Sequence, residues 1–323
     1  MTTITLPAYA FEPELPDLLD RLGAGDAAQE IAVDFLPVTF WTPGALVLLL
    51  GKTHFWLRQN KRVVFHNCKA FPAFRYFQRI NFFSLCGLQM PEDFHRHDAG
   101  SRFVELRCVG GAGATDVGEL STDIAYCISP DAAEMDDPEE SGLFDLLQFS
   151  VSELAGNTIQ HAKAPGFATA QYMPRTDLVR VAIADYGIGV LRSFSENGSP
   201  LWKPELTDAA AIALAVQVKV SSKSHLKSAW GESINAGVGL TLLKEFSALS
   251  GGQFFMASGN GVCFQPAGDK PLKQKILQSS FQGTVCALSF SRAKIRNFPE
   301  LLHKAKQSVG LLPPDREFGK FFT

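Results

Sequence analysis

The chain has 323 residues and a formal net charge of −3, and 46% of its residues are hydrophobic. This length predicts two domains, each with enough apolar residues to bury a core. The near-neutral charge excludes an electrostatic basis for binding nucleic acid or an anionic membrane surface.

The first hundred residues alternate strand-like and helix-like segments, which predicts an α/β unit. Short β-rich runs predict strands, and longer runs with helical spacing of apolar residues predict helices. A polar segment, residues 91–101, is typical of a linker. The expected elements are a strand over 31–35, a helix over 44–60, a strand over 62–66 and a helix over 71–85.

Elements of both kinds also follow the linker. Residues 130–141 are acidic and contain proline, and residues 192–236 are rich in Ser, Lys and Gly, so we expect both segments to be irregular. The expected helices cover 116–128, 143–162, 239–249 and 293–309, and the expected strands cover 103–107, 167–173, 178–186, 253–256 and 284–290.

The sequence predicts a soluble, cytoplasmic protein. Its first residues have neither the basic nor the apolar part of a signal peptide. The longest apolar stretch, residues 45–50, is far shorter than the roughly 20 residues needed to span a bilayer. Cysteines are few for this length and form no C-x-x-C pair, which fits a reducing compartment.

Three polar residues share one face of the helix SVSELAGNTIQHA, residues 150–162, because Glu153, Asn157 and His161 are spaced four apart. Mg²⁺ prefers oxygen ligands and takes only one or two from protein when phosphates and waters supply the rest. The amide oxygen of Asn157 is therefore a candidate metal ligand, and Glu153 a candidate catalytic base. For His161, a proton relay and a packing role both remain open.

The segment LVRVAIADYGIGV, residues 178–190, is a β-rich run that ends at Asp185. A carboxylate at a strand end can accept a hydrogen bond from an exocyclic amine such as that of adenine. Gly187 and Gly189 allow the backbone to turn sharply and to approach a flat ring closely. The segment therefore predicts a turn that binds a purine base.

The segment NAGVGLTLLKEF, residues 235–246, places Gly237, Gly239 and Leu240 at the start of an apolar helix. Free N–H groups at a helix start, together with the helix dipole, favour phosphate binding. The preceding irregular stretch is long enough to fold over a nucleotide as a lid. At most one lysine of that lid is expected to reach phosphate, the alternative being a solvated lid surface: Lys219, Lys223 and Lys227.

The order of these parts, followed by the strand that begins at Gly283 and Thr284, resembles the GHKL ATP-binding fold. Histidine kinases, MutL-type ATPases and anti-sigma-factor serine kinases share this fold. The resemblance covers about residues 103–291 and implies an α/β sandwich, the Bergerat fold, in which helices back a mixed sheet. It implies ATP and Mg²⁺ as the bound cofactors.

The resemblance also implies a role for each residue of these motifs. Glu153 falls on the catalytic acidic position, and Asn157 falls on the Mg²⁺ ligand. The implied cofactor-binding residues are Asn157 for the metal, Asp185, Gly187 and Gly189 for adenine, Gly237, Gly239 and Leu240 for phosphate, and Thr284 near the final strand.

Within this family, the run SELAGNTIQHA is most similar to the anti-sigma-factor serine kinases. One departure is Asn235, which stands where the phosphate-side motif begins with a further glycine. The function implied is a regulatory Mg-ATP-dependent ATPase or serine/threonine kinase. The alternative is a non-catalytic, nucleotide-gated module that binds another protein. A histidine kinase is excluded because no dimerisation helix with a phosphoacceptor histidine precedes the motifs.

The segment VDFLPVTFWTPGALVLLLG, residues 33–51, resembles the central strand, loop and helix of STAS domains, the fold of anti-sigma-factor antagonists. In those domains the partner kinase phosphorylates a Ser or Thr at the helix start. Thr42 occupies that place, and the usual serine pair is missing. Thr42 is a phosphate acceptor or, as we favour, an N-cap of the helix.

Other motifs are rejected. The run from Gly51 to Thr53 imitates the end of a P-loop, but Leu46 stands where the first glycine is required. His95 and His97 lack a supporting Cys or carboxylate cluster, so a solvated linker is expected. The many aromatic residues of segment 71–85 are expected to form core or a domain interface.

The sequence therefore predicts a STAS-like α/β domain over residues 1–97, a GHKL domain over 98–292 and a helical tail over 293–323. The expected partner is a protein, either a regulatory protein or the chain's own STAS-like domain. Neither nucleic acid nor membrane is expected as a partner, and a homodimer remains an open arrangement.

Overall fold

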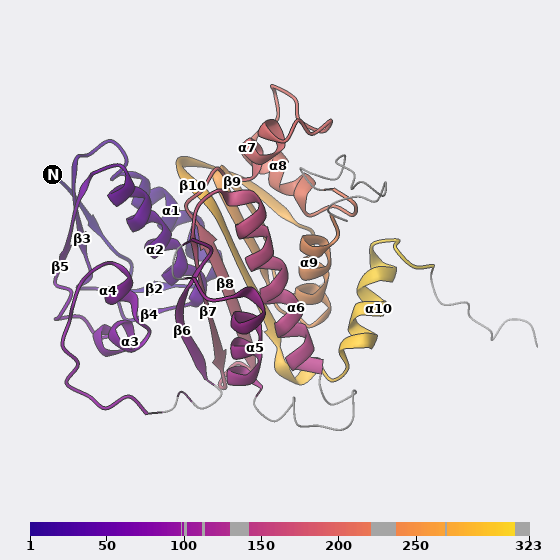
Figure 1. Ribbon diagram of the computed structural model, residues 1–323, viewed down its shortest axis with the longest axis horizontal. Coiled ribbons are helices and arrows are strands. Elements are labelled where there is room, and N and C mark those ends of the chain that lie inside the picture. The colour runs from indigo at the N-terminus through magenta and orange to yellow at the C-terminus, as the bar shows by residue number, and fades with distance from the viewer. Residues whose placement is uncertain are drawn as a thin grey trace, which may run out of the picture.

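The computed structural model describes residues 1–97, 99, 102–111, 114–129, 142–220, 237–268 and 270–313. As predicted, the protein belongs to the α/β class. Figure 1 shows its layers in order: a small sheet near the N-terminus, two helices, a larger sheet, and a second layer of helices.

The small sheet is parallel and has the strand order β1-β3-β5. Its strands are parallel because one helix crosses over between each strand and the next. The elements of this first unit are β1 (Thr2–Thr5), β2 (Tyr9–Ala10), η1 (Glu12–Glu14), α1 (Leu15–Gly23), β3 (Glu30–Asp34), β4 (Phe40–Trp41), α2 (Pro43–Arg58), β5 (Arg62–His66), α3 (Phe74–Arg79) and α4 (Phe82–Leu85), with β2 and β4 forming a separate parallel pair.

The single helix predicted over residues 71–85 is wrong. Two short helices, α3 and α4, occupy this segment, and Asn81 between them has a φ of 66°. This left-handed conformation, which Asn tolerates better than most residues, ends the first helix. The break lets Phe77, Phe82 and Phe83 converge on Phe35, so the aromatic residues form core, as expected.

The large sheet has the order β6-β7-β8-β10-β9. Every neighbouring pair in it is antiparallel, so the expected mixed sheet is wrong. Two consecutive helices connect β6 to β7. They return the chain to the end of the sheet at which β6 finishes, so that β7 runs antiparallel to β6. The strands are β6 (Phe103–Val109), β7 (Gly166–Met173), β8 (Leu178–Asp185), β9 (Phe254–Gln265) and β10 (Lys273–Ser291).

The helices of the second unit differ from the sequence prediction at two places. The helix expected over 143–162 becomes a π-helix after Asn157, and the segment 192–236 contains helices where irregular structure was expected. The helices are α5 (Val117–Ile128), α6 (Gly142–Asn157), the π-helix η3 (Thr158–Ala162), α7 (Val190–Glu196), α8 (Asp208–Ala215), α9 (Gly239–Leu249), η4 (Arg292–Lys294) and α10 (Phe298–Ser308).

Both faces of the large sheet are buried. Alternation along β8 sends Ala182 and Ala184 to a core shared with the first unit, and Val181 and Ile183 to a second core beneath α5, α6 and α9. The shared face is lined by small residues, which allow α2 to approach closely. A Cβ added to Gly44 would lie 3.1 Å from Ala287 Cβ.

Buried charged side chains also join the two units. Arg180 of β8 lies 3.2 Å from Glu12 of η1, and both side chains are almost fully buried. Lys52 of α2 bonds Asp26 at 2.8 Å and donates to the carbonyl oxygen of Ser280 at 3.0 Å. The first unit is therefore packed as a layer of the larger body and shares its core with the large sheet.

Candidate functional site

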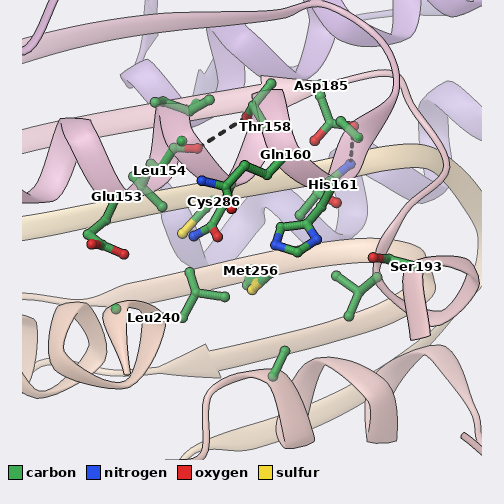
Figure 2. A pocket seen from close by; sticks show the side chains of 18 of the residues that line it. Glu153, Leu154, Thr158, Gln160, His161, Asp185, Ser193, Leu240, Met256 and Cys286 are labelled. Atoms are coloured by element: carbon green, nitrogen blue, oxygen red, sulfur yellow. Dashed lines mark hydrogen bonds between the residues drawn. The ribbon is translucent and has the colours of Figure 1, made fainter. Parts of the chain in front are cut away.

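A cavity of about 320 Å³ opens on the helical face of the large sheet, near the end of β8. This volume falls within the range of small-molecule sites. Figure 2 shows Glu153 and Leu240 toward one end of it and Asp185 and Ser193 toward the other. The predicted site residues that line the cavity are Glu153, Asn157, Asp185, Gly189, Gly237, Gly239, Leu240 and Thr284.

The last turns of α6 and the π-helix η3 form one wall. Glu153, Asn157 and His161 all line the cavity, as their spacing predicted. The π-helix changes the direction of the side chains after Asn157, so that Gln160 lines the cavity beside His161. Single π-helical turns often occur at functional sites because they redirect side chains in this way.

Asp185 lies at the end of β8 and is 4% exposed. Its Oδ1 accepts hydrogen bonds from the N–H groups of Gly187, at 2.9 Å, and Thr284, at 3.2 Å. Among the described residues, no hydrogen bond to its Oδ2 is found, and Asp185 lines the cavity. Burial raises the pKa of this carboxyl to about 7, and the two N–H groups oppose that rise.

Gly187 does not line the cavity, but the turn around Asp185 requires it. A Cβ at Gly187 would lie 1.9 Å from the carbonyl oxygen of Ala162 in η3. Gly189 has a φ of 77° and is the N-cap residue of α7. Gly187 therefore lets the turn pack against the π-helix, and the close approach of the two glycines to a flat ring stays a prediction.

Ser258 of β9 holds this turn from behind. Its hydroxyl accepts a hydrogen bond from the Val190 N–H at 2.9 Å and donates to the Gly283 carbonyl at 2.8 Å. Gly283 precedes Thr284, whose N–H bonds Asp185. One buried hydroxyl thus joins the two backbone segments that surround Asp185, and no sequence motif had indicated it.

The opposite end of the cavity is formed by the start of α9. A Cβ at Gly239 would lie 1.8 Å from Glu153 Oε2, so this carboxylate lies against the first turn of the helix. Burial raises the pKa of Glu153. Among the described residues, the lining of the cavity contains no Lys or Arg.

Two sulfur-containing side chains form the sheet side of the cavity. Met256 of β9 and Cys286 of β10 are direct neighbours in the strand register, and both line the cavity. Sulfur makes favourable contacts with aromatic rings. The sequence alone does not indicate these residues, because strand pairing and helix type decide which side chains face the cavity. The same holds for four further lining residues, Gln160, Val190, Ser193 and Phe194.

Some sequence predictions fall elsewhere. Lys223, Lys227 and Asn235 lie outside the described residues, and Lys219 is described but does not line the cavity. Thr42 is the N-cap residue of α2, yet its hydroxyl donates to the Ala10 carbonyl at 3.2 Å and does not cap the helix. Thr42 is fully buried, so a kinase cannot reach it in this conformation.

Metal and thiol chemistry of the protein side chains is limited. Within the described ranges, no group of three or more His, Cys, Asp or Glu residues is arranged to hold a metal ion. The six cysteines, all of them described, are free thiols.

Among the residues that the structure describes, no helix is both long and apolar enough to cross a membrane. Comparison of the sequence with known protein families and with curated proteins finds no match to either.

Proposed function

We propose that the chain binds Mg-ATP in this cavity and belongs with the GHKL ATPases. The observation that carries the proposal is Asp185, a buried carboxylate with one oxygen held by two backbone N–H groups and the other open to the cavity. The motifs predicted to bind the purine, the metal ion and the phosphates all contribute residues to this one cavity, which supports the proposal further.

When position 6 of the purine ring faces Asp185, the carboxylate favours adenine over guanine. The exocyclic group of adenine is an amine, which donates hydrogen bonds, and that of guanine at the same ring position is a carbonyl oxygen, which accepts them. A carboxylate oxygen accepts from the first and repels the second. Met256 and Cys286 would lie beneath the ring, where sulfur and apolar carbon favour a flat aromatic group.

The phosphates would then extend toward α9. The backbone N–H groups after Gly237 and Gly239 would meet the phosphate oxygens at the helix N-terminus. Asn157 would hold Mg²⁺ through its amide oxygen, and the ion would neutralise phosphate charge. This neutralisation matters because Glu153 brings a negative charge to the same end of the cavity.

Glu153 is the group proposed to carry the chemistry. Its carboxylate would accept the proton of a water or hydroxyl whose oxygen forms a new bond to the γ-phosphorus. The bond from the γ-phosphorus to the bridging oxygen breaks, and ADP leaves with that electron pair. The pKa of Glu153, raised by burial, makes it a better proton acceptor than an exposed glutamate.

One observation favours the alternative, a nucleotide-gated module without turnover. Glu153 lies against the start of α9, where phosphate would bind, and the described lining supplies no Lys or Arg to offset its charge. In this alternative, nucleotide binding would move Glu153 and α9 apart and change the surface seen by a partner. Chemistry would then be slow or absent.

We further propose that the first unit is STAS-like. The parallel strands β1, β3 and β5, each followed by a helical segment, support this proposal, as does the buried helix α2 after the loop that follows β3. Since Thr42 is buried, phosphate transfer within the chain at that residue is disfavoured. A kinase activity would therefore act on a Ser or Thr of a separate regulatory protein.

Calorimetry with ATP, GTP and Mg²⁺ tests the binding proposal. We expect Mg-ATP to bind, ATP without metal to bind more weakly, and GTP to bind least. Absence of heat with folded protein and millimolar ATP would overturn the proposal. Incubation with γ-labelled ATP then separates the two functions, because labelled free phosphate or labelled protein appears only if the chain is an enzyme.

A further inference from the structure

Three aromatic rings join the first unit to the end of β8. The His54 ring of α2 stacks on the Tyr186 ring, with centroids 5.6 Å apart and planes at 26°. Phe167 of β7 lies 4.7 Å from His54 and 6.2 Å from Tyr186. Phe167 and Tyr186 belong to the core shared with the first unit, and Tyr186 directly follows Asp185, which lines the cavity.

His54 is also held on its far side. Its Nε2 lies 2.8 Å from the carbonyl oxygen of Leu85, the last residue of α4, so the ring donates a hydrogen bond there. Its orientation is therefore fixed by α4 on one side and by Tyr186 on the other. An apolar core residue in this place would pack against Tyr186 without this second constraint.

The backbone around Tyr186 is tightly confined. A Cβ at Gly283 would lie 2.7 Å from Tyr186 Cα and 2.2 Å from the Asp185 carbonyl oxygen. A Cβ at Gly51 of α2 would lie 3.9 Å from that same oxygen. With β10 on one side and α2 on the other, a shift of the Tyr186 ring changes the direction of Asp185 and of the Gly187 N–H that bonds it.

We propose that His54 is a positioning residue for the base-binding end of the cavity, and that the first unit sets nucleotide affinity through its contact with Tyr186. This inference rests on the proposed ATP-binding function. It gives the first unit a regulatory role that needs no phosphorylation of Thr42. A partner that moves α2, and His54 with it, would change the affinity of the cavity for adenine nucleotides.

Three variants of the full chain test this assignment. His54→Ala removes the ring, and His54→Phe keeps the ring but loses the hydrogen bond to Leu85. Phe65→Ala is the matched control, because Phe65 is an aromatic residue of β5 whose ring contacts, to Phe35 and Phe82, lie within the first unit. Each variant is measured for Mg-ATP affinity by calorimetry, for melting temperature, and for hydrogen exchange of the Gly187 N–H.

We expect His54→Ala to weaken Mg-ATP binding about tenfold and to speed Gly187 exchange by a similar factor. His54→Phe should stay within about twofold of the unchanged chain in both, because the ring stack remains. Phe65→Ala should lower the melting temperature and change neither the Mg-ATP affinity nor the exchange rate of the Gly187 N–H. A purely structural role for His54 predicts instead that Phe65→Ala and His54→Ala behave alike.

The assignment fails if His54→Ala changes neither Mg-ATP affinity nor Gly187 exchange beyond the change in Phe65→Ala. The exchange measurement requires no nucleotide. If the unchanged chain binds no ATP, the proposed function fails, and Gly187 exchange still decides whether His54 positions this turn.

Discussion

The two faces of the large sheet are built from the same strands but differ in what they enclose. On the face toward the first unit, Ala184 and Ala287 pack closely against α2. On the other face, the helices cover most of the sheet but leave a cavity at the end of β8. Strand alternation alone assigns neighbouring residues to opposite faces.

Along the single strand β8, some residues therefore contribute to the stability of the fold and their neighbours line the candidate site. Ala184 and Asp185 are adjacent, yet one is part of a closely packed core and the other is a buried carboxyl with no counter-charge among the described residues. Natural sites commonly carry such locally unfavourable groups, because ligand binding needs them. We call the face of the large sheet toward the first unit the sealed face, and the face beneath α5, α6 and α9 the cavity face. Substitutions on the sealed face should change the stability of the fold, and substitutions on the cavity face should change ligand binding and chemistry.

The largest effect is expected for Glu153→Gln on the cavity face. Loss of the proton acceptor should reduce ATP turnover about 10³-fold. Binding of ATP without Mg²⁺ should become tighter, because a negative charge next to Gly239 is removed. Phosphate release and calorimetry with and without metal measure the two effects.

Glu196→Gln is the control, since Glu196 of α7 pairs with Lys163 and Arg192 outside the cavity. Equal turnover in both variants would contradict the role of Glu153.

Asp185→Asn should weaken Mg-ATP binding about 100-fold, because a charged acceptor for the base is lost. It should also change the pH dependence of folding. The pKa of Asp185 in the folded chain, about 7, lies above the usual 3.8, so the folded state retains a proton that the unfolded state releases. The stability that Asp185 contributes is therefore present at low pH and is lost as pH rises through about 7.

Denaturant unfolding at pH 5 and pH 8 measures this effect. Relative to the unchanged chain, Asp185→Asn should gain about 3 kcal/mol in free energy of unfolding between these two pH values. ATP affinity of the unchanged chain should rise over the same interval, because the ionised carboxyl is the stronger acceptor. A variant that is less stable than the unchanged chain at pH 8 would refute the view that Asp185 is maintained at a cost in stability.

A pair of enlarging substitutions tests the two faces directly. Ala184→Leu on the sealed face should lower the free energy of unfolding by about 2 kcal/mol, because α2 leaves no space for the added carbons. Cys286→Leu on the cavity face should cost less than about 1 kcal/mol, because its side chain can extend into the cavity. Cys286→Leu should instead block Mg-ATP binding. Equal destabilisation by both substitutions would remove the distinction between the faces.

Much of the cavity could be predicted from the sequence because its motifs depend on local spacing. Glu153 and Asn157 share a face through helical periodicity, and Asp185 with its glycines marks a strand end. The π-helix at Thr158 and the pairing of Met256 with Cys286 could not be predicted in this way. Helix type and strand register depend on tertiary packing, which no local pattern encodes.

The sequence of one helix also indicates that the two units are joined. Segment 44–53 is apolar or small at nearly every position, with Gly44 and Gly51 two turns apart on one face. A helix that is apolar all round is buried on all sides. In the structure α2 is buried between the small sheet and the large one, so the chain division predicted at residue 97 crosses a shared core.

The smallest effect is expected for Ser258→Ala, which changes the cavity face without touching the ligand. Its hydroxyl bonds Val190 and Gly283, the segments on either side of Asp185, and each neutral hydrogen bond contributes about 1 kcal/mol. Mg-ATP affinity should fall about fivefold.

Ser289→Ala is the matched control, because Ser289 is equally buried and accepts a hydrogen bond from the Gln253 N–H in the same pair of strands. Both variants should lose similar stability, but only Ser258→Ala should lose affinity, since only Ser258 holds the turn that presents Asp185 to the cavity. A matching loss of affinity in Ser289→Ala would mean that general loosening of the sheet controls the site.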